Sequence, residues 1–312
     1  HNSKMKIKKP TFWDEKKPNF IAYLLLPLSK IIQIFKSIKK SENLNFPEIK
    51  VICIGNIYIG GTGKTPLSIK ISQLLNAKNL KTTVIKKFYI NQKDEQIIIN
   101  KKTNLINKKK RKESLTNAIN QNFKYAILDD GLQDKSINYD FKICCFSTNN
   151  WIGNGLTIPA GPLREEITSI KNFDIIFLNG PDIENKILKD KILKINKDIK
   201  IFETKYKLKN LNNLDTSKNY VAFSGIGNPK NFDYTLKENN FKIVKHFTFP
   251  DHYNFKKIEI DNLKRFANSK NLEIITTEKD YFRISENLRE KINFIEIDLE
   301  IDNETKFLEL II

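Results

Sequence analysis

The stretch Gly60-Gly61-Thr62-Gly63-Lys64-Thr65 is the strongest indication of the fold of this chain. It follows an apolar segment, 51–54, and precedes a stretch with helical spacing that opens with Pro66. A strand that leads through a glycine-rich turn into a helix places backbone N–H groups and the positive end of the helix dipole around a phosphate. The sequence therefore predicts a phosphate-binding loop. Lys64 is expected to reach the β- and γ-phosphates of a nucleoside triphosphate, and the Thr65 hydroxyl to ligate Mg²⁺.

The spacing of this loop departs from the usual pattern G-x-x-x-x-G-K-[ST]. Tyr58 stands five positions before Gly63, where that pattern has its first glycine, and the earlier glycine is Gly55. The alternative is a glycine-rich turn that binds nothing. The Lys-Thr pair and Pro66 in the first helical turn favour phosphate binding.

Length and composition indicate a folded protein with room for two domains. The chain has 312 residues, of which 40% are hydrophobic and 29% charged. Residues 1–4 precede the single methionine, Met5, and take no part in the fold prediction. Cys53, Cys144 and Cys145 lie in or beside apolar runs without metal-ligand spacing, and adjacent strand residues point to opposite faces. We therefore expect no disulfide and a reducing, cytosolic environment.

The net charge of +18 is concentrated in two places. Residues 1–50 carry eleven lysines against four acidic residues, and residues 101–112 carry six lysines and Arg111 with no acidic residue. A solvated, lysine-rich surface is one explanation, and a basic binding surface is the other.

The N-terminal region combines this charge with an amphipathic pattern. The apolar run 20–28 is too short to span a bilayer and is interrupted by Pro27. Beyond it, one predicted helical face is apolar and the other is basic and polar; the apolar face comprises Leu28, Ile31, Ile32, Phe35 and Ile38. Such a helix either lies in an anionic membrane interface or packs on the domain core, and the pattern alone leaves both open. The sequence shows neither a spanning segment nor a secretory signal, so we expect peripheral, cytoplasmic membrane contact.

Apolar runs that alternate with helical stretches predict an α/β fold, a P-loop NTPase-like doubly wound and mainly parallel sheet. These runs are 51–54, 82–85, 125–128, 141–146, 174–178 and 199–202. The polar segment 211–219 is expected to be a linker, after which the alternation restarts. The predicted organisation is thus a P-loop kinase-like domain over 1–210 and a smaller α/β domain over 220–312, with the site at the carboxyl ends of the strands.

Three further motifs carry candidate chemistry. Asp129-Asp130 ends an apolar strand, where a P-loop enzyme places the carboxylate that holds Mg²⁺, although an Asp-Gly turn is the simpler alternative. The segment 159–166, PAGPLREE, is either a rigid turn before a helix start or, as its fixed shape favours, a frame that presents the donors of Arg164 to a phosphate. In Pro250-Asp251-His252, His252 is a better candidate than His246 for proton transfer, because His246 lies in a strand pattern.

These motifs together resemble the tetraacyldisaccharide 4′-kinase (lipid A 4′-kinase) family. The resemblance runs from about residue 12 to about residue 285. It rests on motifs that occur in a fixed order: Gly55-Asn56 before GGTGKTP, DDGLQ at 129–133, PAGPLRE at 159–165, SGIGNP at 224–229, PDH at 250–252 and TTEKD at 276–280.

The resemblance implies ATP-dependent phosphorylation of the 4′-hydroxyl of a tetraacylated glucosamine disaccharide 1-phosphate at the cytoplasmic face of the bacterial inner membrane. It implies that the N-terminal helix contacts the membrane, where the acyl chains of this glycolipid lie. Lys64 is then expected to hold the ATP phosphates, Thr65 with Asp129 and Asp130 to bind Mg²⁺, and Arg164 with Glu165 to lie beside the transferred group.

The resemblance also suggests the catalytic base. The family has an aspartate in a G-D-E-P stretch, assisted by the histidine of the P-D-H motif, and the matching residues are Asp94 and His252. This chain departs from the pattern, since Lys93 and Gln96 replace the flanking glycine and proline and residues 86–89 replace the family's upstream R-G-Y-G. Arg111 matches a family arginine for which contact with the lipid's phosphate is expected.

Two other classes of ATPase share part of this pattern. A membrane-associated regulatory ATPase that dimerises over ATP carries a lysine immediately before the glycine pair, and Ile59 stands there. A nucleic-acid-stimulated ATPase would account for the basic charge, but residues 101–112 contain no aromatic residue for stacking. We therefore expect no nucleic-acid partner and no obligate protein partner.

Overall fold

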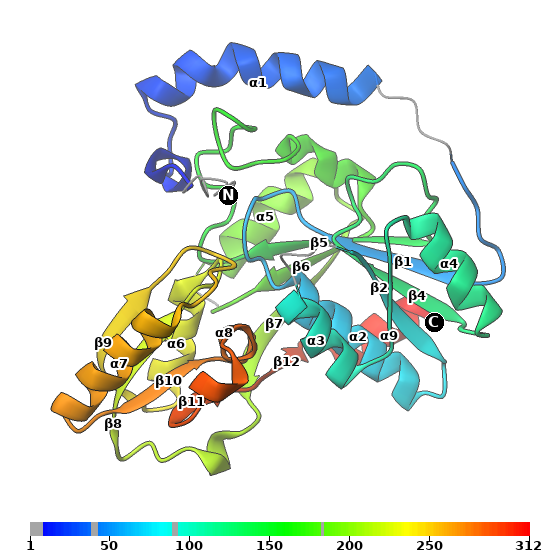
Figure 1. Ribbon diagram of the computed structural model, residues 1–312. Coiled ribbons are helices and arrows are strands. Elements are labelled where there is room, and N and C mark those ends of the chain that lie inside the picture. The colour runs from blue at the N-terminus through cyan, green and yellow to red at the C-terminus, as the bar shows by residue number, and fades with distance from the viewer. Residues whose placement is uncertain (1–8, 39–42, 89–92, 182–183) are drawn as a thin grey trace. The chain divides into compact units, whose positions relative to one another are not determined.

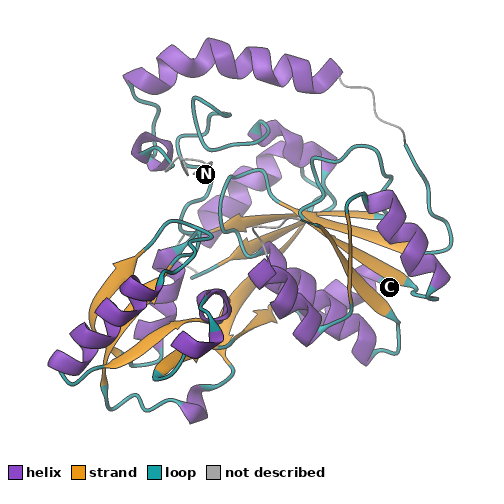
Figure 2. Cartoon of the chain, in the orientation of Figure 1, coloured by secondary structure: helices purple, strands orange, loops and turns teal. Residues whose placement is uncertain are grey.

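The computed structural model describes residues 9–38, 43–88, 93–181 and 184–312. The chain divides into two compact units (Figures 1 and 2). Unit 1 comprises residues 1–88, 102–205 and 301–312, and unit 2 comprises residues 89–101 and 206–300. Each unit is built on its own sheet.

The sheet of unit 1 has eight strands in the order β12-β7-β6-β5-β1-β4-β2-β3. Its seven strands from β1 to β7 pair in parallel, as the alternation of apolar runs and helices predicted. The strands are β1 (Lys50–Gly55), β2 (Thr82–Lys87), β3 (Leu105–Lys108), β4 (Tyr125–Asp129), β5 (Phe141–Ser147), β6 (Ile175–Asn179), β7 (Lys200–Leu208) and β12 (Ile297–Ile301).

Helices cover both faces of this sheet, because alternate strand residues point to opposite sides. Cys144 packs in a core cluster with Leu188 of α5 (Asn185–Ile195), and Ala126 packs in another with Leu115 of α4 (Arg111–Asn120). The opposite face is covered by α2 (Lys64–Ala77) and α9 (Glu304–Ile311), where Phe307 contacts Phe177 edge-on. All three cysteines are buried and free.

The strand order changes direction at β1, which lies between β4 and β5. In a doubly wound sheet, the loops that leave the carboxyl ends of strands at such a point diverge and form the binding crevice. Here these are the loop from β1 to α2 and the turn after β4, so the glycine-rich motif and Asp129-Asp130 lie side by side.

The N-terminal helix α1 (Phe20–Ile38) is longer than predicted, because it continues through Pro27. Its buried face is narrow: the Ser29 hydroxyl donates to Thr157 O (2.9 Å) and accepts from Ala160 N (3.0 Å). The predicted apolar face is not packed on the core, since the side chains at its far end, Phe35 and Ile38, are 72% and 68% exposed. None of the helices in the described ranges is long and apolar enough to cross a membrane.

Unit 2 has a parallel four-stranded sheet in the order β11-β10-β8-β9. The strands are β8 (Asn219–Ser224), β9 (Lys242–Thr248), β10 (Glu273–Thr277) and β11 (Ile292–Ile295). Leu236 of α6 (Pro229–Glu238) packs on one face, and Leu263 of α7 (Lys257–Ser269) packs on the other. The chain crosses from one side of β8 to the other, so its motif loops meet at the carboxyl ends of β8 and β10.

The units differ from the predicted domains at two places. Residues 301–312 belong to unit 1: they begin at Ile301, the last residue of the edge strand β12, and continue into α9, which covers the large sheet. Residues 89–101, within the predicted first domain, belong to unit 2, where Lys101 of α3 (Lys93–Lys102) lies 3.9 Å from the ring centre of Phe282 in α8 (Glu278–Arg283). The expected linker begins with a short 3-10 helix, η4 (Leu211–Asn213).

Candidate active site

The glycine-rich loop has the geometry of a phosphate-binding loop. Gly60 and Gly63 adopt positive φ angles of 130° and 84°, which favour glycine, and Gly63 is the residue before the first turn of α2. No side chain caps that helix terminus. The Thr62 hydroxyl is buried and has no partner among the described residues. The loop thus offers unsatisfied N–H groups and a hydroxyl for an anion.

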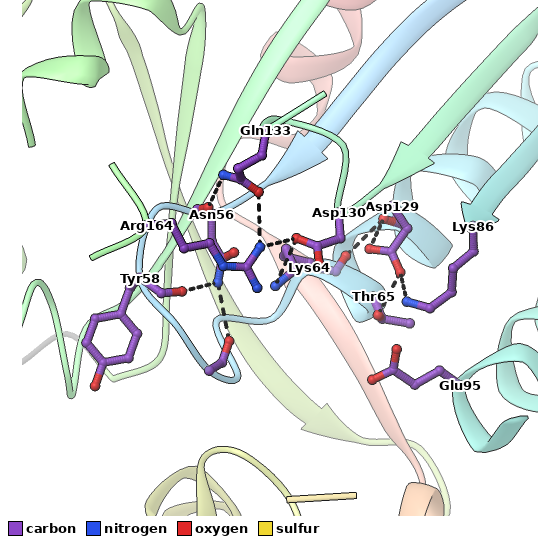
Figure 3. Close-up of polar contacts among 12 residues, drawn as sticks. Asn56, Tyr58, Lys64, Thr65, Lys86, Glu95, Asp129, Asp130, Gln133 and Arg164 are labelled. Atoms are coloured by element: carbon purple, nitrogen blue, oxygen red, sulfur yellow. Dashed lines mark hydrogen bonds and ion pairs between the residues drawn. The ribbon is translucent and has the colours of Figure 1, made fainter. Parts of the chain in front are cut away.

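Tyr58 explains the unusual spacing of the loop. Its side chain is 1% exposed, and its hydroxyl donates to Asp14 (2.6 Å) and accepts from Lys9 (2.7 Å). Asn56 donates its side-chain amide to the carbonyls of Tyr58 (2.5 Å) and Gly60 (3.3 Å), which fixes the turn from within. Figure 3 shows the Tyr58 ring directed away from Lys64. This position therefore anchors the loop to the N-terminal segment.

Asp129 lies at the centre of a buried polar cluster (Figure 3). One carboxylate oxygen, Oδ2, accepts from the Thr65 hydroxyl at 2.9 Å and from Lys86 Nζ at 2.6 Å, and the other accepts from Ser68 at 3.3 Å. The side chains of Lys86 and Asp129 are 6% and 0% exposed. The register of β2 and β4 places these two residues opposite one another. Sequence reasoning missed Lys86, since only the strand register identifies its partner.

Asp130 has different partners from Asp129. Its Oδ1 lies 2.9 Å from a terminal nitrogen of Arg164 and 3.6 Å from Lys64 Nζ. Burial alone would raise the pKa of the Asp130 carboxyl, but the charges of Lys64, Arg164 and Lys86 outweigh it and hold the pKa below its ordinary value. Lys64 and Arg164, separated by 100 residues in sequence, thus meet at one carboxylate.

The donor set around Thr65 and Asp129 fits Mg²⁺ bound together with nucleotide phosphates. The described residues include no group of three or more His, Cys, Asp or Glu side chains that could hold a metal ion. Mg²⁺ is commonly held by one or two protein oxygens, substrate phosphates and water. The Thr65 hydroxyl and Asp129 Oδ2 meet this requirement. Asp130, in contrast, contacts Lys64 and Arg164, whereas the Thr65 hydroxyl contacts Asp129.

The segment PAGPLRE is fixed against the P-loop. Arg164 N donates to Ile57 O at 2.6 Å, and the Arg164 side chain also contacts Gln133 Oε1 at 3.0 Å. Gln133 donates to Asn56 O (3.0 Å) and to Glu165 (3.4 Å), so it joins the two motifs. Helix α1 reaches the same segment, since Lys36 Nζ donates to Arg164 O at 3.1 Å. Arg164 and Glu165 thus lie beside the P-loop.

Arg111 holds the turn after β4. Its terminal nitrogens donate to Asp134 Oδ2 at 2.8 Å and to Asp130 O at 2.7 Å, and its side chain is 13% exposed. Contact with a phosphate of the lipid would require exchange of these partners. The expected substrate role of Arg111 stays a prediction, beside a positioning contact to Asp130.

In unit 2, three motifs converge at the carboxyl edge of the sheet. Asp280 accepts from Gly225 N at 2.9 Å, and His252 N donates to Gly225 O at 3.1 Å. Arg283 joins these elements, because one terminal nitrogen donates both to Gly225 O (2.5 Å) and to Asp280 (2.8 Å). His252 has a positive φ of 56°. Its Nε2 faces Asp251 Oδ2 at 3.9 Å and Glu95 Oε1 at 4.0 Å.

Asp94, the predicted base, lies in α3, and its side chain is outside the described part of the chain. Its neighbour Glu95, which sequence reasoning did not select, is described: its carboxylate is paired with Lys279 and approaches His252. The signal was the acidic pair Asp94-Glu95 itself, of which the family pattern singles out only the first. Helix α3 therefore brings at least one carboxylate to His252.

His246 has a separate hydrogen-bond chain. Its Nε2 contacts Ser224 Oγ at 2.8 Å and its Nδ1 contacts Asp233 Oδ1 at 2.6 Å. Hydrolases use this order of groups to activate a serine, but Ser224 is 0% exposed, so no substrate reaches it. These hydrogen bonds instead connect the elements that carry the three residues, β8, β9 and α6.

The fold and the P-loop cluster define the class of protein: a P-loop α/β protein in which the glycine-rich loop, its lysine and the paired aspartates lie together, as is typical of nucleotide-phosphate sites. Comparison with known proteins identifies the family within that class. A family model described as tetraacyldisaccharide-1-P 4'-kinase matches residues 21–312. The chain belongs to this family.

Individual relatives are similar in sequence to this chain over nearly its whole length. The tetraacyldisaccharide 4'-kinase of Pelagibacter ubique (strain HTCC1062) is 46% identical over 300 residues, which are 96% of each chain. That of Rickettsia typhi is 37% identical over 324 residues, again 96% of each chain. A crystal structure of LpxK from Aquifex aeolicus, described as an "apo" form in complex with ATP, has a TM-score of 0.67 at 20% identity and covers 93% of this chain and 96% of its own. That structure supports the fold.

Proposed function

We propose that this protein transfers the γ-phosphoryl group of ATP, with Mg²⁺, to the 4′-hydroxyl of a tetraacyldisaccharide 1-phosphate and so forms a lipid A precursor, lipid IVA. Family membership supports the reaction. The observation that carries the proposal is the P-loop cluster, in which Lys64 and Arg164 meet at Asp130 while Thr65 meets Asp129. Phosphoryl transfer needs mainly positioning and charge neutralisation, which such a cluster supplies.

The residues of unit 1 bind the ATP phosphates and Mg²⁺. The glycine-rich loop, residues 60–65, holds the phosphates through its N–H groups, and Lys64 neutralises their charge. Thr65 and Asp129 hold Mg²⁺, and Asp130 orients Lys64 and Arg164. Mg²⁺ supplies charge neutralisation of the phosphate oxygens. Arg164 stabilises charge on the transferred group, with Glu165 beside it.

The residues of unit 2 remove the proton from the 4′-hydroxyl of the substrate. Asp94 accepts the proton of the 4′-hydroxyl as that oxygen attacks phosphorus and ADP leaves, and His252 assists the carboxylate. The contact between His252 and the next residue of α3, Glu95, supports pairing this helix with His252 in proton transfer. Arg111, if it exchanges its present partners, contacts the 1-phosphate of the lipid.

Helix α1 brings the protein to the membrane that holds the acyl chains. It exposes a row of large apolar side chains to solvent: Phe20, Ile21, Tyr23, Leu24, Leu28, Ile31, Ile34, Phe35 and Ile38. Lysines flank these residues, and a basic amphipathic helix of this kind binds anionic interfaces. We infer peripheral association with the cytoplasmic face of the bacterial inner membrane, with the glycolipid as the substrate.

The proposal is tested by transfer of labelled phosphate from ATP to tetraacyldisaccharide 1-phosphate in detergent micelles. Labelled glycolipid is expected only when Mg²⁺ is present. Lys64→Ala is expected to abolish transfer, whereas Lys81→Ala, at an exposed lysine of the same unit that follows α2, is expected to keep it. Wild-type protein that forms no labelled glycolipid in any suitable detergent would overturn the proposal.

A further inference from the structure

The guanidinium of Arg283 determines which nitrogen of His252 carries a proton. Arg283 NH2 lies 3.2 Å from His252 Nδ1. Because a guanidinium has only donors, this contact is a hydrogen bond only when Nδ1 is an unprotonated acceptor. The proton of a neutral His252 must then be on Nε2.

Arg283 is held firmly enough to impose this state. Its other terminal nitrogen donates to Gly225 O at 2.5 Å and to Asp280 Oδ1 at 2.8 Å, and the side chains of Arg283 and Asp280 are 5% and 0% exposed. Asp280 is fixed in turn by Gly225 N and by the Thr277 hydroxyl at 2.8 Å. The guanidinium therefore cannot rotate away from His252 without breaking bonds to buried acceptors.

The opposite side of the imidazole faces acceptors. Nε2 lies 3.9 Å from Asp251 Oδ2 and 4.0 Å from Glu95 Oε1, and Lys279 pairs with Glu95. A donor on one side and carboxylates on the other favour the tautomer with hydrogen on Nε2. A doubly protonated ring would direct Nδ1–H at an N–H of Arg283, which is repulsive.

We propose that Arg283 is a positioning residue that holds His252 neutral with its proton on Nε2, so that His252 donates a hydrogen bond to a carboxylate instead of accepting the substrate proton. The effect on catalysis rests on the proposed function, whereas the tautomer of His252 follows from the contact with Arg283 alone. Proton acceptance is thereby left to Asp94, the proposed base on α3. His252 only stabilises that carboxylate through Nε2–H.

The charges around His252 are consistent with a neutral ring. Burial lowers the pKa of His252, and the Lys279 and Arg283 charges lower it further, whereas Asp251 and Glu95 oppose them. The net effect is a pKa below the ordinary histidine value. His252 is thus uncharged at neutral pH and gains a proton only as the pH falls through its lowered pKa.

The test is nitrogen NMR of the full chain labelled at histidine. The chain has three histidines, at positions 1, 246 and 252, and a His252→Asn variant assigns the signals. His246 is an internal reference of opposite type, because its Nδ1 meets Asp233 Oδ1 and must carry a proton. The expected wild-type spectrum shows His252 protonated at Nε2 and His246 protonated at Nδ1. A proton on Nδ1 of neutral His252 would overturn the proposal without any mutation.

Variants of Arg283 test the consequence for catalysis. Arg283→Met with Asp280→Asn removes both charges, so that no buried carboxylate is left unpaired, and Arg283→Lys keeps the charge. In the double variant we expect the His252 pKa to rise, the acid limb of the kcat profile to move to higher pH, and kcat to fall by up to roughly 100-fold. Arg283→Lys, which keeps the charge, should show smaller changes in all three quantities.

The two possible failures are distinguishable. An unchanged His252 pKa and pH profile in a folded double variant would refute the role of Arg283. A His252→Asn variant with wild-type kcat would refute the proposed role of His252 in transfer, while the wild-type spectrum still tests the tautomer.

Discussion

Lys86 is expected to hold Asp129 in place when Mg²⁺ is absent, and Lys86→Met tests this directly. The two side chains, 6% and 0% exposed, approach to 2.6 Å. Removing one partner of a buried pair leaves an uncompensated charge and typically costs about 3–5 kcal/mol. The hydroxyls of Thr65 and Ser68 still donate to Asp129, so we expect the lower end, about 3 kcal/mol. For a unit of this size that is roughly a 6–12 °C fall in Tm.

Mg²⁺ should reduce this loss, because the ion and the Lys86 ammonium compensate the same carboxylate oxygen. The assay is thermal unfolding of wild type and Lys86→Met, first in EDTA and then with Mg²⁺ and a non-hydrolysable ATP analogue. We expect the Tm difference between the two proteins to be several-fold smaller in the second condition.

A matched control is Lys70→Met, which removes the pair between α2 and α9. Lys70 lies 3.4 Å from Glu304, and these side chains are 16% and 39% exposed. A partly exposed pair is worth at most about 1 kcal/mol. Its loss should not depend on Mg²⁺. If Lys86→Met lost the same stability in both conditions, or lost none in EDTA, the position assigned to Mg²⁺ at Asp129 would be refuted.

Three further predictions concern catalysis, membrane binding and acid stability. Asp94→Ala should lower kcat by about two orders of magnitude or more with little change in the KM for ATP, and a near-wild-type rate in steady-state assays would reassign the base. Phe35→Glu should weaken the binding to anionic vesicles that flotation measures by about tenfold or more, since burying such a side chain is worth about 1.5–3 kcal/mol. The control Leu310→Glu, on α9, should leave vesicle binding unchanged. Equal effects of the two substitutions would argue against α1 as the membrane contact. Because the native pKa of Asp130 is lowered, the native state binds fewer protons than the unfolded state, so its stabilisation is present above the ordinary carboxyl pKa and is lost as pH falls through the native one. Asp130→Asn should therefore flatten urea unfolding midpoints over that acidic range, and an unchanged slope would contradict the pairing with Lys64 and Arg164.

Much of the fold could be predicted because the strands of a parallel sheet are buried on both faces and form continuous apolar runs. The runs 51–54, 125–128 and 141–146 lie within β1, β4 and β5. Helix α3 was missed because its three consecutive isoleucines, Ile97 to Ile99, stand among polar residues and fit a strand as well as a helix. The assignment of α9 to unit 1 depends on contacts across the chain, such as Phe307 with Phe177, which no local pattern indicates.

The candidate site was predictable to the extent that its residues belong to contiguous motifs. The P-loop, the aspartate pair and Arg164 were found in this way, and the structure brings Lys64, Asp130 and Arg164 together. Lys86 was missed because a lysine at a strand end usually reaches solvent, and only the register with Asp129 shows it buried. The role of Arg283 could not be predicted either, because it depends on how the Arg283 side chain at the end of α8 and the His252 side chain in a loop point toward one another.

The position of the transferred phosphate on the glycolipid is the most direct test of the proposed reaction. Purified protein is incubated with ATP, Mg²⁺ and tetraacyldisaccharide 1-phosphate, and the product is analysed by tandem mass spectrometry and phosphorus NMR. We predict one added phosphate on the 4′-oxygen with wild-type protein and none with Lys64→Ala. Phosphate at another position, or hydrolysis of ATP with unmodified glycolipid, would contradict it.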